Sequence, residues 1–513
     1  MKKIFLIIIF LCLALHVVAQ YEEASSFAET ITHEDLIDYL TILSSDALEG
    51  RETGERGQKM AAAFIAYHFE NIGLKPVVKN GDTYSYYQRF ALEKSYPGEI
   101  YITIDGTKKI NGEDLIYWGR KNMDTEEQIQ AVFVGAGSEE SFQATQVAGK
   151  AAVIFASGAG FQGWRTLSDR ATKNNAAVTF LVVADNADTY NSLLSRFKNY
   201  FMGSNLGFKT EGTSAASGGV FLISQSLAAQ LLKTDEEKLM NAVANYDEGN
   251  KKALQKIKPA TFGYKITRKS DIMWTENVLG YLEGTDKKEE LVIITSHYDH
   301  IGKRGDEINN GADDNGSGTS SVMEIAQAFA EAKRSGHGPR RSMLFMTVTG
   351  EEKGLLGSQY YVENPVFPLE NTVVDFNIDM IGRHDPEHDD NLDFIYLVGS
   401  DKLSSELHEL SEMANSTFTN LSLDYTYNDE NHPDRIYYRS DHWNFAKNDI
   451  PVIFYFSGFH ADYHKPTDTI DKIEFDMLEQ RARLVYYTAW VVANREDRIV
   501  VDVPKDISIE SKD

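Results

Sequence analysis

The sequence predicts an α/β protein whose larger domain is a mostly parallel sheet wrapped by helices. From Asn277 onward, short apolar runs of strand length alternate with amphipathic segments of helical length, which is the pattern of β-α-β units. Between residues 101 and 265 the hydrophobic pattern changes to short apolar runs separated by Gly, Asn and Lys, which indicates a separate, β-rich α/β domain. A chain of 513 residues is long enough for both domains.

The expected elements follow from hydrophobic periodicity. A helix is expected over 58–70, because Ala61, Ile65 and Phe69 recur on one face at helical spacing. Further helices are expected over 33–43 and 317–332. The expected strands are 291–295, 343–349, 373–378, 394–398 and 452–456 in the larger domain, and 131–134, 151–155, 178–183 and 220–223 in the smaller one.

Composition narrows the range of functions. Hydrophobic residues make up 42% of the chain and charged residues 25%, which is ordinary globular usage. The 77 acidic residues against 51 basic ones give a net charge of −26, which opposes binding to nucleic acid or to an anionic membrane surface.

Residues 1–19 are predicted to be a signal peptide. Lys2 and Lys3 precede an apolar run over 4–15, small residues follow, and cleavage is expected before Gln20. This run is shorter than the roughly 20 residues that span a bilayer, and no other apolar run is long enough. We therefore expect an exported protein, periplasmic or extracellular, with no stable membrane insertion after cleavage.

The cysteine content restricts the metal chemistry. Cys12 is the only cysteine and lies inside the expected leader. The exported protein would have no thiol, and therefore neither disulfides nor a Cys-ligated metal. Any metal must then be bound by His, Asp and Glu.

The predicted domain boundaries lie where the hydrophobic pattern of the sequence changes. After the leader, residues 20–100 form the N-terminal part of the larger domain, and residues 101–265 form the inserted domain. Residues 266–500 form the main part of the larger domain, and residues 501–513 form a charged, mobile tail.

Polar clusters follow several of the expected strands, where open α/β sheets bind ligands. Glu351 and Glu352 follow the strand at 343–349, and adjacent carboxylates repel unless a cation compensates, which indicates a metal. Taken singly, each cluster is also explained as a solvated loop or a helix cap. The five clusters are 296–300, 311–318, 349–354, 377–382 and 462–469.

The first cluster contains a His-x-Asp pair. Alternation along a strand lets the side chains of His297 and Asp299 point the same way, so Asp299 could accept the second imidazole proton of a metal-bound His297. An ordinary surface pair is the alternative.

In this order, the five clusters resemble the motifs of the co-catalytic zinc exopeptidases related to bacterial leucyl aminopeptidase and aminopeptidase Y, a family that also contains glutamate carboxypeptidases and glutaminyl cyclases. The resemblance extends from His33 to about Asn494. It implies a three-layer helix-sheet-helix catalytic domain with a mostly parallel mixed sheet, of the zinc exopeptidase or phosphorylase/hydrolase-like type. Residues 101–265 resemble the protease-associated (PA) domain that some members carry as an insertion.

The resemblance implies two Zn²⁺ ions per chain, bound only by nitrogen and oxygen ligands, with manganese or cobalt as substitutes in vitro. It implies that Asp313 bridges the ions and that the peptide bond from Asp313 to Asp314 is cis. The other implied ligands are His297 and Asp379 on one ion, and Glu352 and His464 on the other.

The resemblance also implies a mechanism. A metal-bridging hydroxide attacks a carbonyl that the same cations polarise. Glu351 remains uncoordinated and transfers the proton from this water to the leaving amine. Tyr463 matches a position at which relatives donate to the oxyanion, with simple packing as the alternative. Glu351, Asp299 and Tyr463 are therefore the expected catalytic residues.

Two other polar segments receive different interpretations. The segment 384–390 is favoured as a solvated loop, with a structural calcium site as the alternative. Ser440, Asp441 and His442 are not a catalytic triad, because consecutive residues cannot present a nucleophile, a base and an orienting group in the required geometry. The resemblance places them in a wall near the site.

The sequence therefore predicts an exported, zinc-dependent exopeptidase, in the first place an aminopeptidase that removes N-terminal residues from peptides. A carboxypeptidase or a glutaminyl cyclase of the same family is the enzymatic alternative. A catalytically inactive binding protein on this fold is the alternative of another class, and the presence of every implied ligand and of Glu351 argues against it.

Overall fold

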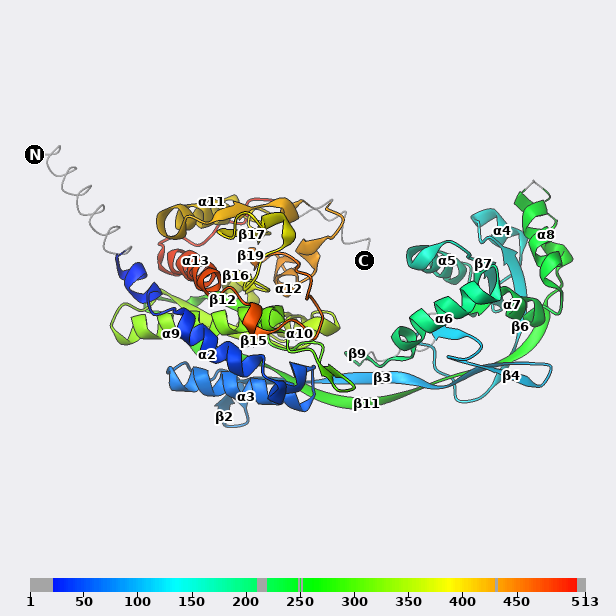
Figure 1. Ribbon diagram of the computed structural model, residues 1–513, viewed down its shortest axis with the longest axis horizontal. Helices are drawn as coiled ribbons and strands as arrows, with labels where there is room; N and C mark the ends of the chain where they lie inside the picture. The colour runs from blue at the N-terminus through cyan, green and yellow to red at the C-terminus, as the bar shows by residue number, and fades with distance from the viewer. Residues whose placement is uncertain (1–21, 210–218, 248–249, 251, 430–431, 505–513) are drawn as a thin grey trace, which may run out of the picture. The chain divides into compact units, whose positions relative to one another are not determined.

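The computed structural model describes residues 22–209, 219–247, 250, 252–429 and 432–504 (Figure 1). The expected signal peptide and most of the expected tail lie outside these residues. The chain forms two compact units: unit 1 contains the chain up to Ala91 and from Trp274 onward, and unit 2 is Leu92–Met273.

Unit 2 extends further at both ends than the 101–265 expected for the inserted domain. Two long strands, β3 (Tyr87–Ile104) and β11 (Ala260–Leu282), have residues in both units. A strand that continues from one unit into the next has no turn residues at the boundary, and the residue pattern of the sequence therefore does not change there.

Unit 1 is built on a mixed sheet with the strand order β18-β17-β19-β16-β12-β15-β11. The four central strands, β19, β16, β12 and β15, are parallel to one another, whereas β17 pairs antiparallel to β19 and β11 pairs antiparallel to β15. This confirms the mostly parallel sheet. In the structure the bounds of these strands are β12 (Lys287–His297), β15 (Arg341–Val348), β16 (Thr372–Ile378), β17 (Phe394–Val398), β18 (Ser422–Asp424) and β19 (Val452–Phe456).

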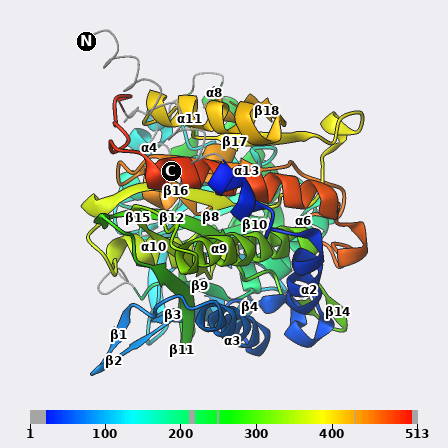
Figure 2. The ribbon, with the colours of Figure 1, turned by 90° about the vertical axis from the view of Figure 1, so that its left-hand side faces the viewer.

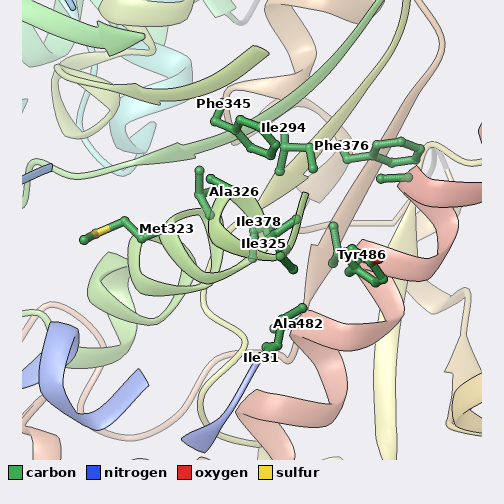
Figure 3. Close-up of a cluster of buried hydrophobic side chains, with 14 of the residues drawn as sticks. Ile31, Ile294, Met323, Ile325, Ala326, Phe345, Phe376, Ile378, Ala482 and Tyr486 are labelled. Atoms are coloured by element: carbon green, nitrogen blue, oxygen red, sulfur yellow. The ribbon is translucent and has the colours of Figure 1, made fainter. Parts of the chain in front are cut away.

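The central strands are apolar throughout because both faces of the sheet are covered. Along β12, Val292 and Ile294 belong to one buried core, and Leu291 and Ile293 belong to the core on the opposite face. In the first core, shown in Figure 3, Ile294 lies with side chains of β15 and β16 and of two helices. The period of two along the strand therefore builds both cores at once.

Helices cover both faces of this sheet, which confirms the three-layer architecture. On one face α9 (Gly318–Arg334) contacts β12, β15 and β16, and α13 (Phe475–Asn494) packs against α9 (Figure 2). On the other face α12 (His442–Ala446) contacts β16 and β19 and packs against α10 (Leu356–Glu363).

The N-terminal part of unit 1 joins the first of these layers. Helix α2 (His33–Leu43) has the bounds that its periodicity predicts, and Thr32 caps it by accepting a hydrogen bond from the amide of Asp35. Its buried face packs on α9 and α13. Helix α3 (Arg56–Asn71) also contacts α9. The remaining elements of unit 1 include α11 (Ser405–Ala414), β1 (Val78–Asn80), β2 (Thr83–Ser85), β13 (Lys303–Arg304) and β14 (Glu307–Ile308).

Unit 2 has its own sheet, in which β6, β7, β8 and β10 run parallel and β5 pairs antiparallel at the end. Two cores lie on the two faces of this sheet. The bounds are β4 (Thr107–Ile110), β5 (Ile116–Trp118), β6 (Glu127–Gly135), β7 (Ala151–Phe155), β8 (Val178–Ala184), β9 (Asn205–Gly207), β10 (Gly219–Ser224), α4 (Glu139–Ala144), α5 (Gly160–Lys173), α6 (Ala187–Met202), α7 (Gln225–Leu231) and α8 (Glu236–Asp247).

Within the part of the chain that the structure describes, no helix has the length and apolar character needed to cross a bilayer.

Candidate metal centre

The predicted site residues converge at one edge of the unit 1 sheet. Strands β16, β12 and β15 are parallel neighbours and end at the same edge. His297 is the last residue of β12, Asp379 follows β16, and Glu351 begins the short turn after β15. The sheet therefore brings together three polar clusters that are far apart in the sequence.

The loop before α9 supplies a carboxylate from Asp314, and not from Asp313 as predicted. Asp314 belongs to both groups of side chains whose donor atoms lie close enough to share a cation: one with His297 and Asp379, the other with His300 and Glu352. The cis peptide bond is Asp314–Asn315, one residue later than expected. Asp314 is thus the residue placed to bridge two ions.

Asp313 points away from this centre. Its Oδ1 accepts a hydrogen bond of 2.7 Å from the amide of Gly382, and its Oδ2 lies 3.2 Å from Nε2 of His460. The amides of Asp313 and Asp314 both donate to the buried carboxylate of Asp468, at 3.1 Å. Adjacent residues of this loop face opposite ways, so a displacement of one position in the motif exchanges the inward and outward carboxylates.

The entry to this loop requires a glycine. Gly311 has a φ of +57°, and a Cβ atom there would lie 2.2 Å from the carbonyl oxygen of Asp314. The buried guanidinium of Arg51 donates to the carbonyls of Asn310, Gly311 and Tyr298 at 2.7–2.9 Å. Arg51 therefore fixes the segment that carries the ligands, a role that nothing in its surrounding sequence indicates.

Asp379, Glu352 and His464 occupy the positions expected of ligands. Asp379 Oδ1 lies 3.3 Å from Nε2 of His297, and Nε2 of His464 lies 3.0 Å from Asp314 Oδ2 and 3.2 Å from Glu352 Oε2. These contacts place His464 with the Asp314 and Glu352 group.

His300 is a further site residue that the sequence analysis did not select. Its Nδ1 lies 2.8 Å from Oε1 of Glu352 and 3.7 Å from Oδ2 of Asp314. The two oxygens of Glu352 thus face two different imidazoles. The signal in the sequence was a second histidine three residues after His297, just beyond the end of the same strand.

The donor set fits a divalent cation. Nδ1 of His297 lies 3.1 Å from the main-chain carbonyl of Asp299, so it carries the proton there and Nε2 presents its lone pair. That lone pair faces carboxylate oxygens of Asp379 at 3.3 Å and Asp314 at 3.4 Å. When His297 is neutral, a metal ion between Nε2 and these oxygens would compensate their buried charge, and in the absence of a metal a proton on Nε2 does so.

The pKa values of the candidate ligands are shifted because several carboxylates and imidazoles are buried close together. Burial disfavours the charged form of His297, but the carboxylates of Asp379 and Glu351 raise its pKa well above the ordinary value. His464 has its pKa raised to about 10 by Asp314 and Glu352, against the effect of burial. Burial opposes the ionisation of Glu352, yet hydrogen bonds with His300 and His464 hold its pKa well below the usual range.

Glu351 differs from its neighbour Glu352. Burial raises the pKa of Glu351 well above its ordinary range, although His297, at 3.9 Å, partly opposes this. The amide of Glu351 donates to Oδ1 of Asp299 at 3.3 Å. Glu351 therefore lies next to the candidate ligands without belonging to either cation group.

Asp299 acts on the site in a different way from the one expected. Its carboxylate lies 3.9 Å from Nδ1 of His297, and the closer acceptor for that nitrogen is its own main-chain carbonyl. The carboxylate instead accepts a 2.6 Å hydrogen bond from the hydroxyl of Thr53 and holds the Glu351 amide. Asp299 thus ties the His297 strand to the Glu351 turn.

Ser440 lies directly behind the ligands. Its hydroxyl donates to Oδ2 of Asp379 at 2.8 Å and accepts from the side-chain amide of Asn377 at 2.9 Å. Asp441 accepts a hydrogen bond from Ser358, and Nε2 of His442 donates one to the main-chain carbonyl of Tyr437 at 2.8 Å, so these three consecutive side chains diverge and form no triad.

The segment 384–390 is held by contacts outside the metal centre. His388 stacks on Phe394 with 3.4 Å between ring centroids and lies 2.8 Å from Oδ1 of Asp385, whose Oδ2 accepts from Tyr396 at 2.7 Å. His384 pairs with Glu474. Among the described residues this segment supplies none of the candidate cation groups.

A pocket opens beside the ligands. Asp314, Glu351 and Asp379 line one part of it. Tyr463 also lines it, stacked on His464 with 3.9 Å between ring centroids, and burial together with the charges of Asp314 and Glu352 raises its pKa. The rest of the lining is Met380, Ile436, Arg439, Phe454, Phe456 and Phe459.

Part of the chain is similar to known peptidases. Residues 277–489 match peptidase family M28. Aminopeptidase YwaD of Bacillus subtilis (strain 168) is 25% identical over 339 residues, which cover 60% of this chain and 68% of YwaD. A probable leucine aminopeptidase of Arthroderma otae is 30% identical over 215 residues, and the alignment spans 40% of this chain and about half of that relative, 55%.

Solved structures share the fold. An aminopeptidase from Aneurinibacillus sp. strain AM-1 superposes with a TM-score of 0.56 at 19% identity, covering 94% of this chain and all (100%) of that chain. BSAP, a zinc aminopeptidase from Bacillus subtilis, gives 0.51 at 19% identity, with 91% and 96% covered. The residues that match the family include every ligand position described above. Residues 277–489, which hold all of these positions, therefore match peptidase family M28, and the chain is a metallopeptidase.

Proposed function

We propose that this protein is an exported aminopeptidase that removes N-terminal residues from peptides with the help of two zinc ions. The observation that carries the proposal is the shared position of Asp314 in two groups of donor atoms, one completed by His297 and Asp379 and the other by His300 and Glu352. His464 lies beside the second group, 3.0 Å from Asp314 and 3.2 Å from Glu352. Relatives named as aminopeptidases support the reaction class.

The ions would be held by these side chains. When bound, zinc supplies a Lewis acid for the scissile carbonyl and lowers the pKa of water. His300 keeps the carboxylate of Glu352 in place, and Ser440 does the same for Asp379. Such contacts behind the ligands fix their orientation and usually matter nearly as much as the ligands themselves.

Glu351 is the group that moves the proton. Its carboxylate would take a proton from the attacking water and pass it to the leaving amine. The hydroxyl of Tyr463, which lines the same pocket as Glu351, would donate to the carbonyl oxygen as negative charge develops there. Asp299 holds the Glu351 turn through its amide.

The pocket supports an aminopeptidase over the enzymatic alternatives. Of its acidic side chains, Glu351 belongs to neither candidate cation group and can accept a hydrogen bond from an N-terminal amine. Its aromatic side, formed largely by Phe454 and Phe456, suits an apolar side chain of the first residue. Export rests on the predicted leader, and for unit 2 we retain the interpretation as a PA-like insertion.

A substrate panel tests the proposal. The zinc-loaded protein is given a tripeptide that begins with leucine, the same peptide with an acetylated N-terminus, and a peptide that begins with glutamine. Release of leucine from the free tripeptide alone, lost with a strong chelator and restored by zinc, is the expected result. Cleavage of the acetylated peptide from its C-terminal end indicates a carboxypeptidase, and loss of ammonia from the glutamine peptide indicates a cyclase.

The control is Glu351→Gln, which leaves the ligands intact. It should bind both ions and release no leucine above a few per cent of the wild-type rate. No turnover of any substrate by the zinc-loaded wild type would favour the inactive binding protein.

A further inference from the structure

We propose that Arg439 gives the pocket a binding site for a carboxylate of the substrate. This inference rests on the proposed aminopeptidase function, because it names a chemical group that the substrates carry. Arg439 is the one basic residue in the described lining of the pocket, alongside the Glu351 base and the Asp314 and Asp379 ligands.

The guanidinium is held by an aromatic side chain and not by an acid. It lies 5.1 Å from the ring centroid of Phe459. Phe459 packs on Tyr463 with 4.9 Å between centroids, and Tyr463 stacks on His464 at 3.9 Å. A continuous row of rings thus connects the cation to a metal ligand and sets its distance from the reacting centre.

The charge of Arg439 is not neutralised by a neighbour. Among the described residues no ion pair or hydrogen bond from its side chain is present, whereas nearby Arg383 pairs with Asp462 at 2.7 Å and the buried Arg51 and Arg481 are saturated with carbonyl oxygens. Arg439 is also exposed to solvent. Its five donors are therefore open to a ligand that enters the pocket.

A carboxylate is the group that matches these donors. The planar guanidinium binds a carboxylate through two parallel hydrogen bonds, and the low polarity of Phe456 and Phe459 beside it strengthens that pairing.

Two parts of a peptide can supply the carboxylate: an acidic side chain on the N-terminal residue, or the free C-terminus of a very short peptide. Both have the same chemistry at Arg439, and the substrates can separate them. Leucine p-nitroanilide carries neither group. Glutamate p-nitroanilide carries only the side-chain carboxylate, and the dipeptide Leu-Leu carries only the C-terminal one, which its amide Leu-Leu-NH₂ lacks.

The experiment compares kcat/KM for these four substrates in zinc-loaded wild type and in Arg439→Gln, Arg439→Lys and Arg435→Gln. Arg435→Gln is the matched control, since Arg435 also lies over an aromatic ring, that of Tyr438 at 4.6 Å, but does not line the pocket. Metal content and the thermal midpoint Tm are measured for every variant.

For Arg439→Gln we expect a loss of about 10- to 100-fold in kcat/KM, mainly through KM, on the substrate that carries the recognised carboxylate, because a hydrogen bond to a charged group is removed. Leucine p-nitroanilide should change by no more than about two-fold. Arg439→Lys should retain part of the activity, because it keeps the charge without the planar fork. Arg435→Gln should match the wild type.

Equal losses on all four substrates in Arg439→Gln would overturn the inference, as would unchanged kinetics on every carboxylate-bearing substrate. A different result would refute the proposed function: wild-type protein with both zinc ions bound that cleaves none of the four substrates. The carboxylate site, which rests on that function, would then be refuted as well. Loss on glutamate p-nitroanilide assigns the N-terminal side chain, and loss on Leu-Leu but not on Leu-Leu-NH₂ assigns the C-terminus.

Discussion

Nε2 of His460 lies 3.2 Å from Oδ2 of Asp313. This contact takes the carboxylate of Asp313 away from the metal centre and leaves the centre to Asp314. The neighbouring acids of the same loop therefore have separate tasks, one in holding the loop and one in holding the ions.

Substitution of these neighbours should separate the tasks. Asp314→Asn should lose at least one zinc ion and about 100-fold or more of the activity, because the carboxylate shared by both donor groups is gone. Asp313→Asn should keep both ions and fall no more than about ten-fold in activity, while its free energy of unfolding drops by about 1–3 kcal/mol with the weakened contacts to Gly382 and His460.

Metal analysis and denaturant unfolding of the two variants check this pair. A zinc-free Asp313→Asn protein beside a fully loaded Asp314→Asn protein would restore the original assignment of the bridge.

Glu351 and Glu352 should also respond differently. Glu351→Gln should keep both ions and a nearly unchanged KM while kcat falls by about 10²- to 10⁴-fold, because only a proton acceptor is removed. Glu352→Gln should weaken one ion, since an amide oxygen is a poorer ligand than a carboxylate, and part of its activity should return at high zinc concentration. Metal content and kcat are measured for both, and a fully active Glu351→Gln enzyme would refute the assigned base.

Removal of unit 2 should leave the metal centre assembled. Every candidate ligand lies in unit 1, and the two strands that enter and leave unit 2, β3 and β11, are hydrogen-bonded to each other, so a short linker can join Ala91 to Trp274. The shortened protein should bind the same number of zinc ions as the full chain. A folded variant, with native circular dichroism, that binds none would show that unit 2 is needed for the site.

The stability of unit 1 should depend on pH through Glu324. Burial in α9 raises the pKa of this carboxyl to about 8, and the charge of Asp35 adds to the shift. Because the folded-state pKa lies above the unfolded one, the protonated acid contributes stability at low pH that is lost as the pH rises through about 8. Glu324→Gln keeps the neutral form and should therefore be more stable than the wild type at pH 9.

The expected gain at pH 9 is on the order of 2–4 kcal/mol, and the gain at pH 5 should be small. The thermal midpoints of both proteins at the two pH values measure it. Glu331→Gln, on the exposed end of the same helix where Glu331 pairs with Arg334, is the control and should show no such pH dependence. A Glu324→Gln gain of equal size at pH 5 and pH 9 would contradict ionisation as its cause.

The elements of unit 1 were predictable because each carries a local signal. Helix α2 has the bounds that its apolar spacing and the cap at Thr32 indicate, and strands β17 and β19 have the bounds of their apolar runs. The boundaries of unit 2 were less predictable. Strands β3 and β11 continue through these boundaries, and a regular strand contains no turn residue that would show in the sequence where one unit ends.

The sequence by itself determined the residue types of the site, the strand ends on which they lie and the family motif that they form, since strand periodicity and the order of the clusters are local properties. Only the tertiary structure decided that Asp314 faces the ligands and Asp313 faces His460. Both are aspartates of one glycine-containing loop, and which carboxylate points inward depends on backbone angles that are fixed by distant partners. Those partners, Asp468 and Arg51, lie more than a hundred residues away along the chain and act through main-chain hydrogen bonds that no side-chain pattern records.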